Sequence, residues 1–133
     1  MIADLTREQQ LIKESIAKLC EQYDDQYWLD RDNDGVFPED FCRAFADAGH
    51  CSVLCLRFGR VNPENRPTQA REYAVWCSHR DAVQSIEKCI EAPLELPFDT
   101  FFINSDNKYG YRDLGHARQI VYFVPEDRAE DYR

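Results

Sequence analysis

Five consecutive residues, Cys77 to Asp81, supply the side-chain types of a nucleophile, a base and an acid. A catalytic triad needs these groups to converge in space. Neighbouring residues on a strand or at a helix start point in different directions, so Ser78 and His79 are not expected to act together. Ser78 followed by Asp81 is instead the pattern of a helix N-cap. The segment therefore predicts a structural role for Ser78 and no catalytic residue.

Two groups of potential metal ligands are incomplete. The segment from Asp30 to Gly35 carries Asp at alternate positions and begins like an EF-hand loop, but its twelfth position, which needs a bidentate Glu, is Phe41. Cys51 and Cys55 form the only close cysteine pair, and they lack the spacing and the second pair of a structural zinc site. We predict no metal site, and we expect residues 30–37 to be a solvated polar connection.

The elements that bind dinucleotides are also absent from the sequence. A dinucleotide fold needs closely spaced glycines, so that the backbone approaches the pyrophosphate at a helix N-terminus. The five glycines are dispersed, at positions 35, 49, 59, 110 and 115, and no Tyr has a Lys four residues later. We therefore expect that this chain alone binds no cofactor.

Charge and hydropathy exclude two classes of partner. The 133 residues include 25 acidic and 16 basic ones, for a net charge of −9, which repels phosphate backbones and excludes nucleic acid. No apolar run approaches the roughly 20 residues of a membrane span, and the first residues show no export signal, so we expect no membrane partner and a cytoplasmic location. The six cysteines are expected to be reduced core residues.

The first 50 residues are predicted to form a helical hairpin. Thr6 and Gln9 make a capping box, and apolar residues follow it at helical spacing to about Trp28. A second helix begins at Pro38, and Gly49 supplies a left-handed stop.

The remaining residues, 51–133, change to an α/β pattern. The run from Cys51 to Phe58 is almost wholly apolar, as in a strand that is buried on both faces. Strands are also expected at Tyr73–Trp76 and Phe98–Ile103, with helices from Ser78 to Ala92 and from Asp113 to Val121 and a charged surface tail from Pro125. The predicted fold class is α/β: a helical hairpin followed by a small, largely parallel sheet fragment with flanking helices.

The N-terminal part resembles the N-terminal helical domain of acyl-CoA dehydrogenases. The resemblance covers residues 4–49 and rests on four segments: Leu5 to Ile12, Tyr27 to Asp30, Gly35 to Phe41 and Ala46 to Gly49. It implies an ancestry among FAD enzymes. In that family the flavin and the catalytic Glu lie on later domains, which the strand at Cys51 replaces here.

The C-terminal part resembles the end of extended short-chain dehydrogenase/reductases, nearest the NAD-dependent sugar epimerase and uronate dehydrogenase branch. The resemblance covers residues 53–133 and rests on Leu56 to Pro67, Trp76 to Asp81, Ser105 to Asn107, Gly115 to Arg118 and Pro125 to Tyr132. It implies the C-terminal part of a Rossmann-type fold and an ancestry among NAD(P) enzymes.

This resemblance also implies two substrate-binding residues. Arg71 matches the family's Arg that meets an anionic substrate group, and a guanidinium suits a carboxylate. Asn62, which follows the first strand, is a weaker candidate for the same pocket. The chain departs from the family at Tyr122, where the family usually has Gly. A left-handed cap would cost roughly 1–2 kcal/mol there, so we expect a different turn.

Two hypotheses follow. The first is an oxidoreductase-derived fusion or truncated chain that is inactive alone and lacks the nucleotide-binding half. The second is a non-catalytic module that binds a partner through its acidic hairpin. The resemblance to the reductases implies that the strand at Val53–Phe58 has lost a neighbour from the missing half. Either the hairpin of residues 6–49 covers this edge or a second copy adds its own edge, and we expect self-association.

Overall fold

The computed structural model describes residues 4–49 and 51–132, and the chain divides into two compact units. We name Met1–Val53 the helical unit and Leu54–Arg133 the sheet unit. The predicted ranges 1–50 and 51–133 include residues 1–3, 50 and 133, which lie outside the described residues.

The helical unit begins with the predicted capping box. Helix α1 (Arg7–Cys20) starts after Thr6, whose hydroxyl accepts a hydrogen bond from the Gln9 backbone N–H at 3.2 Å. The Gln9 side chain accepts one in return from the Thr6 N–H at 2.9 Å. This reciprocal cap satisfies two N–H groups that a helix start otherwise leaves unpaired.

The expectation of one long first helix is wrong, because a second cap interrupts it. The Asp24 carboxylate accepts a hydrogen bond from the Tyr27 N–H at 2.9 Å and starts helix α2 (Asp25–Asp34). Helix α2 includes Asp30, Asp32 and Asp34, which were expected in a polar connection, and it ends at Gly35 with a φ of 63°. The predicted hairpin is therefore three helices.

The third helix follows the prediction. Helix α3 (Glu39–Asp47) starts directly after Pro38, and Gly49 has the expected positive φ, 74°. Aromatic rings of α2 and α3 make edge-to-face contacts; Trp28 and Phe41 lie 4.8 Å apart between ring centroids. Among the described residues of this unit, however, Ala46 alone is buried. The helical unit thus has very little core of its own.

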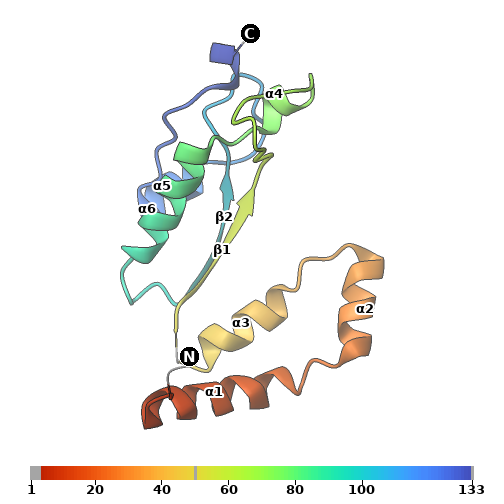
Figure 1. Cartoon of the computed structure of the whole chain (residues 1–133), viewed down its shortest axis with the longest axis vertical. Coiled ribbons are helices and arrows are strands. Elements are labelled where there is room, and N and C mark those ends of the chain that lie inside the picture. The colour runs from red at the N-terminus through yellow and green to blue at the C-terminus, as the bar shows by residue number, and fades with distance from the viewer. Residues whose placement is uncertain (1–3, 50, 133) are drawn as a thin grey trace. The chain divides into compact units, whose positions relative to one another are not determined.

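The sheet unit is built on two parallel strands. Strands β1 (Val53–Phe58) and β2 (Phe98–Ile103) lie side by side, and helix α5 (His79–Ile90) belongs to the connection between them (Figure 1). The strand order and the helical crossover are those of a βαβ unit. The predicted bounds of β2 are confirmed, and the helices with a two-stranded sheet confirm the α/β class.

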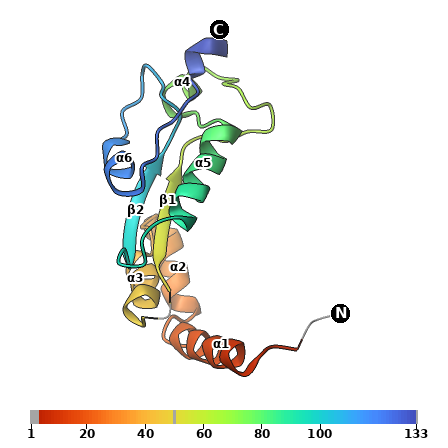
Figure 2. The same ribbon diagram turned by 90° about the vertical axis from the view of Figure 1, so that its left-hand side faces the viewer.

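Helices α5 and α6 (Gly115–Val121) lie on the same side of the two strands (Figure 1, Figure 2). Their apolar side chains pack against alternate residues of the strands, because successive side chains of a strand point to opposite faces. The buried core of the unit consists of Cys77, Phe101, Ile103, Ala117, Val121 and Phe123, with Leu54 and Leu56 packed against it.

Two predictions for the sheet unit are wrong. Residues Glu72–Val75 form a short helix, α4, where a strand was expected, and only Trp76 makes a parallel bridge, to Arg60. Tyr122 does adopt the left-handed conformation, with a φ of 59°. This conformation turns the chain so that Phe123 is fully buried, and burial of a Phe offsets a strain of about 1–2 kcal/mol.

The tail lies mostly at the surface, as expected, although Pro125 and Ala129 are buried. It ends in a short 3-10 helix, η1 (Ala129–Tyr132), whose first residue is fully buried. All six cysteines are free, as expected, but Cys20 and Cys51 are exposed and Cys77 alone is fully buried. Among the described residues, no helix is long and apolar enough to cross a membrane.

Candidate functional site

The carboxyl ends of β1 and β2 meet at one edge of the sheet, where ligands bind in open α/β sheets. Gly59, directly after β1, donates its N–H to the carbonyl of Ile103 at 2.8 Å. Arg60 then donates its N–H to Val75 O at 2.7 Å and accepts from the Cys77 N–H at 3.0 Å. These bonds anchor both ends of the loop 61–71 at this edge.

Glycine is required at position 59 because the backbone is crowded there. A Cβ at this position would lie 1.9 Å from Val75 O and 2.4 Å from Asn104 Oδ1. In a dinucleotide fold, the backbone at a glycine is open so that the pyrophosphate can approach it. At Gly59 this space is occupied by Val75 and Asn104. The described residues do not fit the phosphates of NAD here.

The loop is held in shape from inside by Asn62, which is 4% exposed. Its side-chain amide donates to Arg66 O at 2.8 Å and accepts from the Arg66 N–H at 3.3 Å. Its backbone carbonyl lies 2.7 Å from His79 Nε2. Asn62, a predicted substrate-binding residue, therefore has its side chain occupied by the loop.

Arg71 lies just outside a buried carboxylate. Its neighbour Glu72 is 2% exposed and accepts hydrogen bonds from the backbone N–H and hydroxyl of Thr68, at 2.7 and 3.0 Å, and from Arg60 Nε at 3.3 Å. The N–H of Thr68 is the main cause that lowers the pKa of the Glu72 carboxyl. Arg71 itself is exposed, and its guanidinium has no hydrogen-bond or ion-pair partner among the described residues. Arg71 therefore faces solvent, and the loop that carries it is held by the hydrogen bonds that Glu72 accepts.

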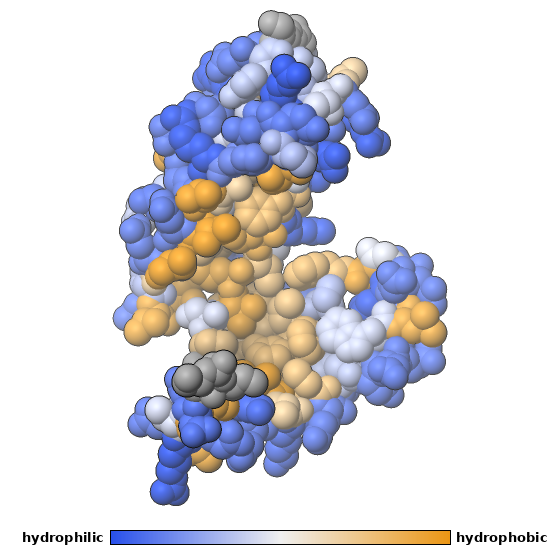
Figure 3. All heavy atoms as spheres, viewed as in Figure 1, coloured by the Kyte–Doolittle hydropathy of each residue, from blue (hydrophilic) through white to orange (hydrophobic). Residues whose placement is uncertain are grey.

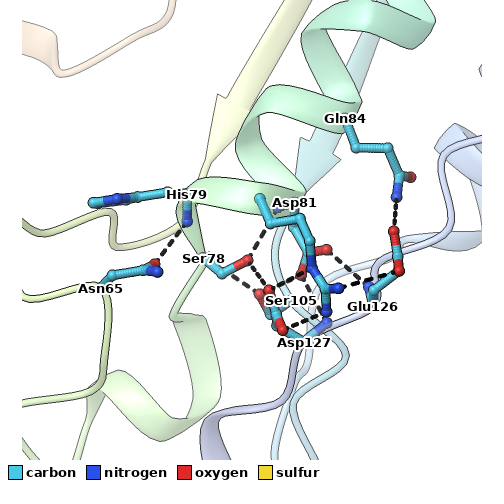
Figure 4. A network of polar contacts seen from close by, with 9 residues as sticks. Asn65, Ser78, His79, Asp81, Gln84, Ser105, Glu126 and Asp127 are labelled. Carbon is cyan, nitrogen blue, oxygen red and sulfur yellow. Dashed lines mark hydrogen bonds and ion pairs between the residues drawn. The ribbon is translucent and has the colours of Figure 1, made fainter.

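A second buried carboxylate ties three segments together (Figure 4). Asp81, which is fully buried, accepts from Ser105 Oγ at 2.6 Å and from the N–H groups of Glu126 and Asp127 at 2.8 and 3.2 Å. Ser78 accepts from the Asp81 N–H at 3.0 Å, which confirms the predicted N-cap, and donates to Asp127 Oδ2 at 2.6 Å. The network joins the start of α5 to the end of β2 and to the tail.

The same contacts rule out nucleophilic chemistry at Cys77 to Asp81. Burial, helped by the charges of Asp81 and Asp127, raises the pKa of the Cys77 thiol to about 12, so no thiolate forms at neutral pH. His79 points away from Ser78, with its ring Nε2 at the carbonyl of Asn62 (Figure 4). The base beside the Ser78 hydroxyl is the Asp127 carboxylate, which is paired with Arg80 at 2.6 Å, and no imidazole is placed to activate Ser78.

Sequence reasoning missed the buried residues that position this edge. Glu72 drew no prediction from the sequence, and the partners of Asp81 lie 24 to 46 residues further along the chain. The only local signal was the spacing of Ser78 and Asp81, which gives the cap but not the contacts of the carboxylate.

Comparison with known structures finds that this chain is similar to part of three solved structures. Uronate dehydrogenase from Agrobacterium tumefaciens superposes with a TM-score of 0.63 at 29% sequence identity, over 71% of this chain and 34% of that chain. A mutant of the same enzyme complexed with NAD gives the same values. Glucuronic acid dehydrogenase from Chromohalobacter salexigens gives 0.64 and 26%, over 73% of this chain and 35% of that chain.

The likeness supports an oxidoreductase ancestry. The chain spans about a third of the length of these neighbours. No protein-family model matches the sequence, and no curated protein matches it. The resemblance of residues 4–49 to acyl-CoA dehydrogenases, and with it a link to FAD, stays a prediction.

Proposed function

We propose that this chain supplies the substrate side of an NAD-dependent dehydrogenase that acts on a sugar acid, and that it is inactive alone. The observation that supports this most is the likeness of 71–73% of this chain to uronate and glucuronic acid dehydrogenases at 26–29% identity. The dinucleotide is then held by residues outside these 133, because the five glycines of this chain are too dispersed to form the loop that holds a pyrophosphate.

Arg71 is the residue that we assign to the substrate. Its guanidinium lies in the loop after β1, on a segment fixed by the buried Glu72, and it has no partner among the described residues. An unpaired guanidinium can form a bidentate pair with a carboxylate, and the fixed segment places Arg71 at the loop surface. Asn62 serves the same site indirectly, since its amide shapes the loop.

The test is a titration of the chain with glucuronate, followed by amide chemical shifts. We expect weak, saturable shifts in the loop 61–71, and at least tenfold weaker binding in Arg71→Gln, since a charge-assisted bond contributes about 1.5–3 kcal/mol. Arg66→Gln is the matched control, because it removes the same charge from the same exposed loop. If the two variants bind glucuronate with equal affinity, Arg71 is not a substrate-binding residue.

We further propose that the chain self-associates through the outer edge of β1. Because Gly59 directs its N–H to β2, alternation directs the backbone groups of Leu54 and Leu56 away from β2. Arg112 Nη1 covers the carbonyl of Phe58 at 3.2 Å, but it does not reach the earlier residues of the strand. An unpaired strand edge of this kind readily adds another strand. Light scattering that shows a 15.7 kDa monomer at micromolar concentration would contradict this proposal.

A specific observation also favours the second candidate, a protein-interaction module in the helical unit. Residues 1–53 hold twelve acidic and five basic residues. Helix α1 has no buried residue, and Leu11, Ile12 and Ile16 are 55%, 46% and 37% exposed. Figure 3 shows that apolar residues also lie elsewhere on the surface. An amphipathic helix gains most of its stability by burying its apolar face. If this candidate holds, Ile12→Asp will abolish capture of a basic protein partner, and Lys13→Asp will leave it intact.

A further inference from the structure

A cavity of about 230 Å³ lies between the end of β2 and the start of α6. It is separate from the loop that carries Arg71, because none of its lining residues belongs to residues 59–72. Most of its lining is polar: Asn104, Ser105, Asp106, Asn107, Gly110, Arg112, Leu114, Gly115 and Arg118. Its volume is sufficient for one small molecule and too small for a dinucleotide.

The charged groups of this cavity favour an anion, although the chain as a whole carries −9. Its one carboxylate, Asp106, is already paired with Arg128 at 2.7 Å, and Arg128 does not line the cavity. The two guanidinium groups, of Arg112 and Arg118, have no carboxylate partner among the described residues. The lining is therefore locally positive.

Arg112 is also held in place. Its Nη1 donates to the carbonyl of Phe58 at 3.2 Å, and its guanidinium lies 5.5 Å from the ring centroid of Phe102. A planar guanidinium offers five N–H donors, so the remaining ones are free for a ligand. Arg118 is exposed on α6 and has no hydrogen-bond or ion-pair partner for its side chain among the described residues. One arginine is thus fixed and the other is free to close on a bound group.

Asn104 adds an acceptor to the same lining. This residue is 2% exposed, and its Oδ1 has no hydrogen-bond partner in the part of the chain that the structure describes. A buried amide oxygen without a partner costs about 1–3 kcal/mol, so such groups are normally satisfied by something. This oxygen packs against Gly59, where a Cβ would lie 2.4 Å from it, so a ligand hydroxyl in the cavity donates to it when the amide turns away from Gly59.

We infer that this cavity binds a small hydroxylated oxyanion, of the sugar-acid or sugar-phosphate class. The carboxylate or phosphate accepts hydrogen bonds from Arg112 and Arg118, and a neighbouring hydroxyl donates to Asn104 Oδ1. The inference goes beyond the proposed function, because it needs neither Arg71 nor a dinucleotide.

The experiment is a titration of the full chain at constant ionic strength, monitored by amide chemical shifts. Four probes separate the sources of the anion: glucuronate, glucose 6-phosphate, inorganic phosphate and neutral glucose. We expect one or both sugar anions to shift the amides of Asn104, Gly110 and Gly115, and to bind at least tenfold more tightly than phosphate. Absence of these shifts with both sugar anions, equal binding of phosphate, or equal binding of glucose would overturn the inference.

Three variants locate the site. Arg118→Gln should weaken binding about tenfold or more, and Asn104→Asp should weaken it as well, because a second anion would face the ligand. The matched control is Arg7→Gln, which removes an exposed arginine of α1 and should bind as the native chain does. Arg71→Gln should also leave these shifts unchanged, so a failure of the proposed function is distinguishable from a failure here. If Arg7→Gln weakens binding as much as Arg118→Gln does, the ligand is held by general charge attraction and not by this cavity.

Discussion

Replacing Asp81 by Ala removes the acceptor of three hydrogen bonds at the N-terminal end of α5. The donors are Ser105 Oγ at 2.6 Å and the N–H groups of Glu126 and Asp127 at 2.8 and 3.2 Å. Each buried donor left without a partner costs about 1–3 kcal/mol, and the two backbone groups are close enough to the surface to recover some hydration. We therefore expect a loss of about 3–4 kcal/mol, from a total of roughly 4–12 kcal/mol for a unit of about 80 residues.

The assay is urea unfolding followed by tryptophan fluorescence. A Trp28→Phe background leaves Trp76, which is fully buried in the sheet unit, as the only reporter. Glu87→Ala is the matched control, since it removes a carboxylate from an exposed position of the same helix. If Asp81→Ala unfolds within about 0.5 kcal/mol of Glu87→Ala, the network contributes little and its assigned role is wrong.

Three further predictions concern single side chains. Burial, together with the 2.6 Å hydrogen bond to Asp40, raises the pKa of Tyr27 to about 12, so the helical unit should lose stability as the pH rises from about 10 through 12. Ultraviolet titration of the native chain and Tyr27→Phe checks this, and a lone transition near pH 10 would contradict it. Tyr122→Gly should stabilise the sheet unit by about 1 kcal/mol in urea unfolding, because Gly adopts a φ of 59° without strain; a loss of stability would show that the ring packs usefully. Iodoacetamide at neutral pH should label Cys51 quickly and Cys77 only after unfolding, and mass spectrometry of the native chain would detect the opposite order.

Local signals in the sequence predicted the elements that depend on local chemistry. The capping box at Thr6 and Gln9 placed the start of α1, and the β-favouring run of Phe98 to Ile103 gave the bounds of β2. The first helix was predicted too long because the apolar spacing continues past Cys20, while Asp24 restarts the helix with its own cap. Periodicity alone cannot show such a break, since both helices place apolar residues at similar spacing.

The site was less predictable because its contacts join distant segments. Arg71 and Asn62 followed from a family resemblance, and the loop chemistry that occupies Asn62 has no signature in the sequence. The turn at Tyr122 was predicted from the strain of a left-handed conformation alone. The structure adopts this conformation, and Phe123, the next residue, is buried. Such a compensation between neighbours depends on the packed core and is visible only in three dimensions.

The central claim is that this chain carries the substrate side of a dehydrogenase fold and no cradle for its dinucleotide. Titration calorimetry of the chain with NAD tests it most directly. We expect no saturable heat up to about 1 mM NAD, because the glycines at positions 35, 49, 59, 110 and 115 are too dispersed to form a dinucleotide-binding loop. A one-site isotherm with a Kd of about 10 μM, equivalent to roughly 7 kcal/mol of binding free energy, would contradict the account.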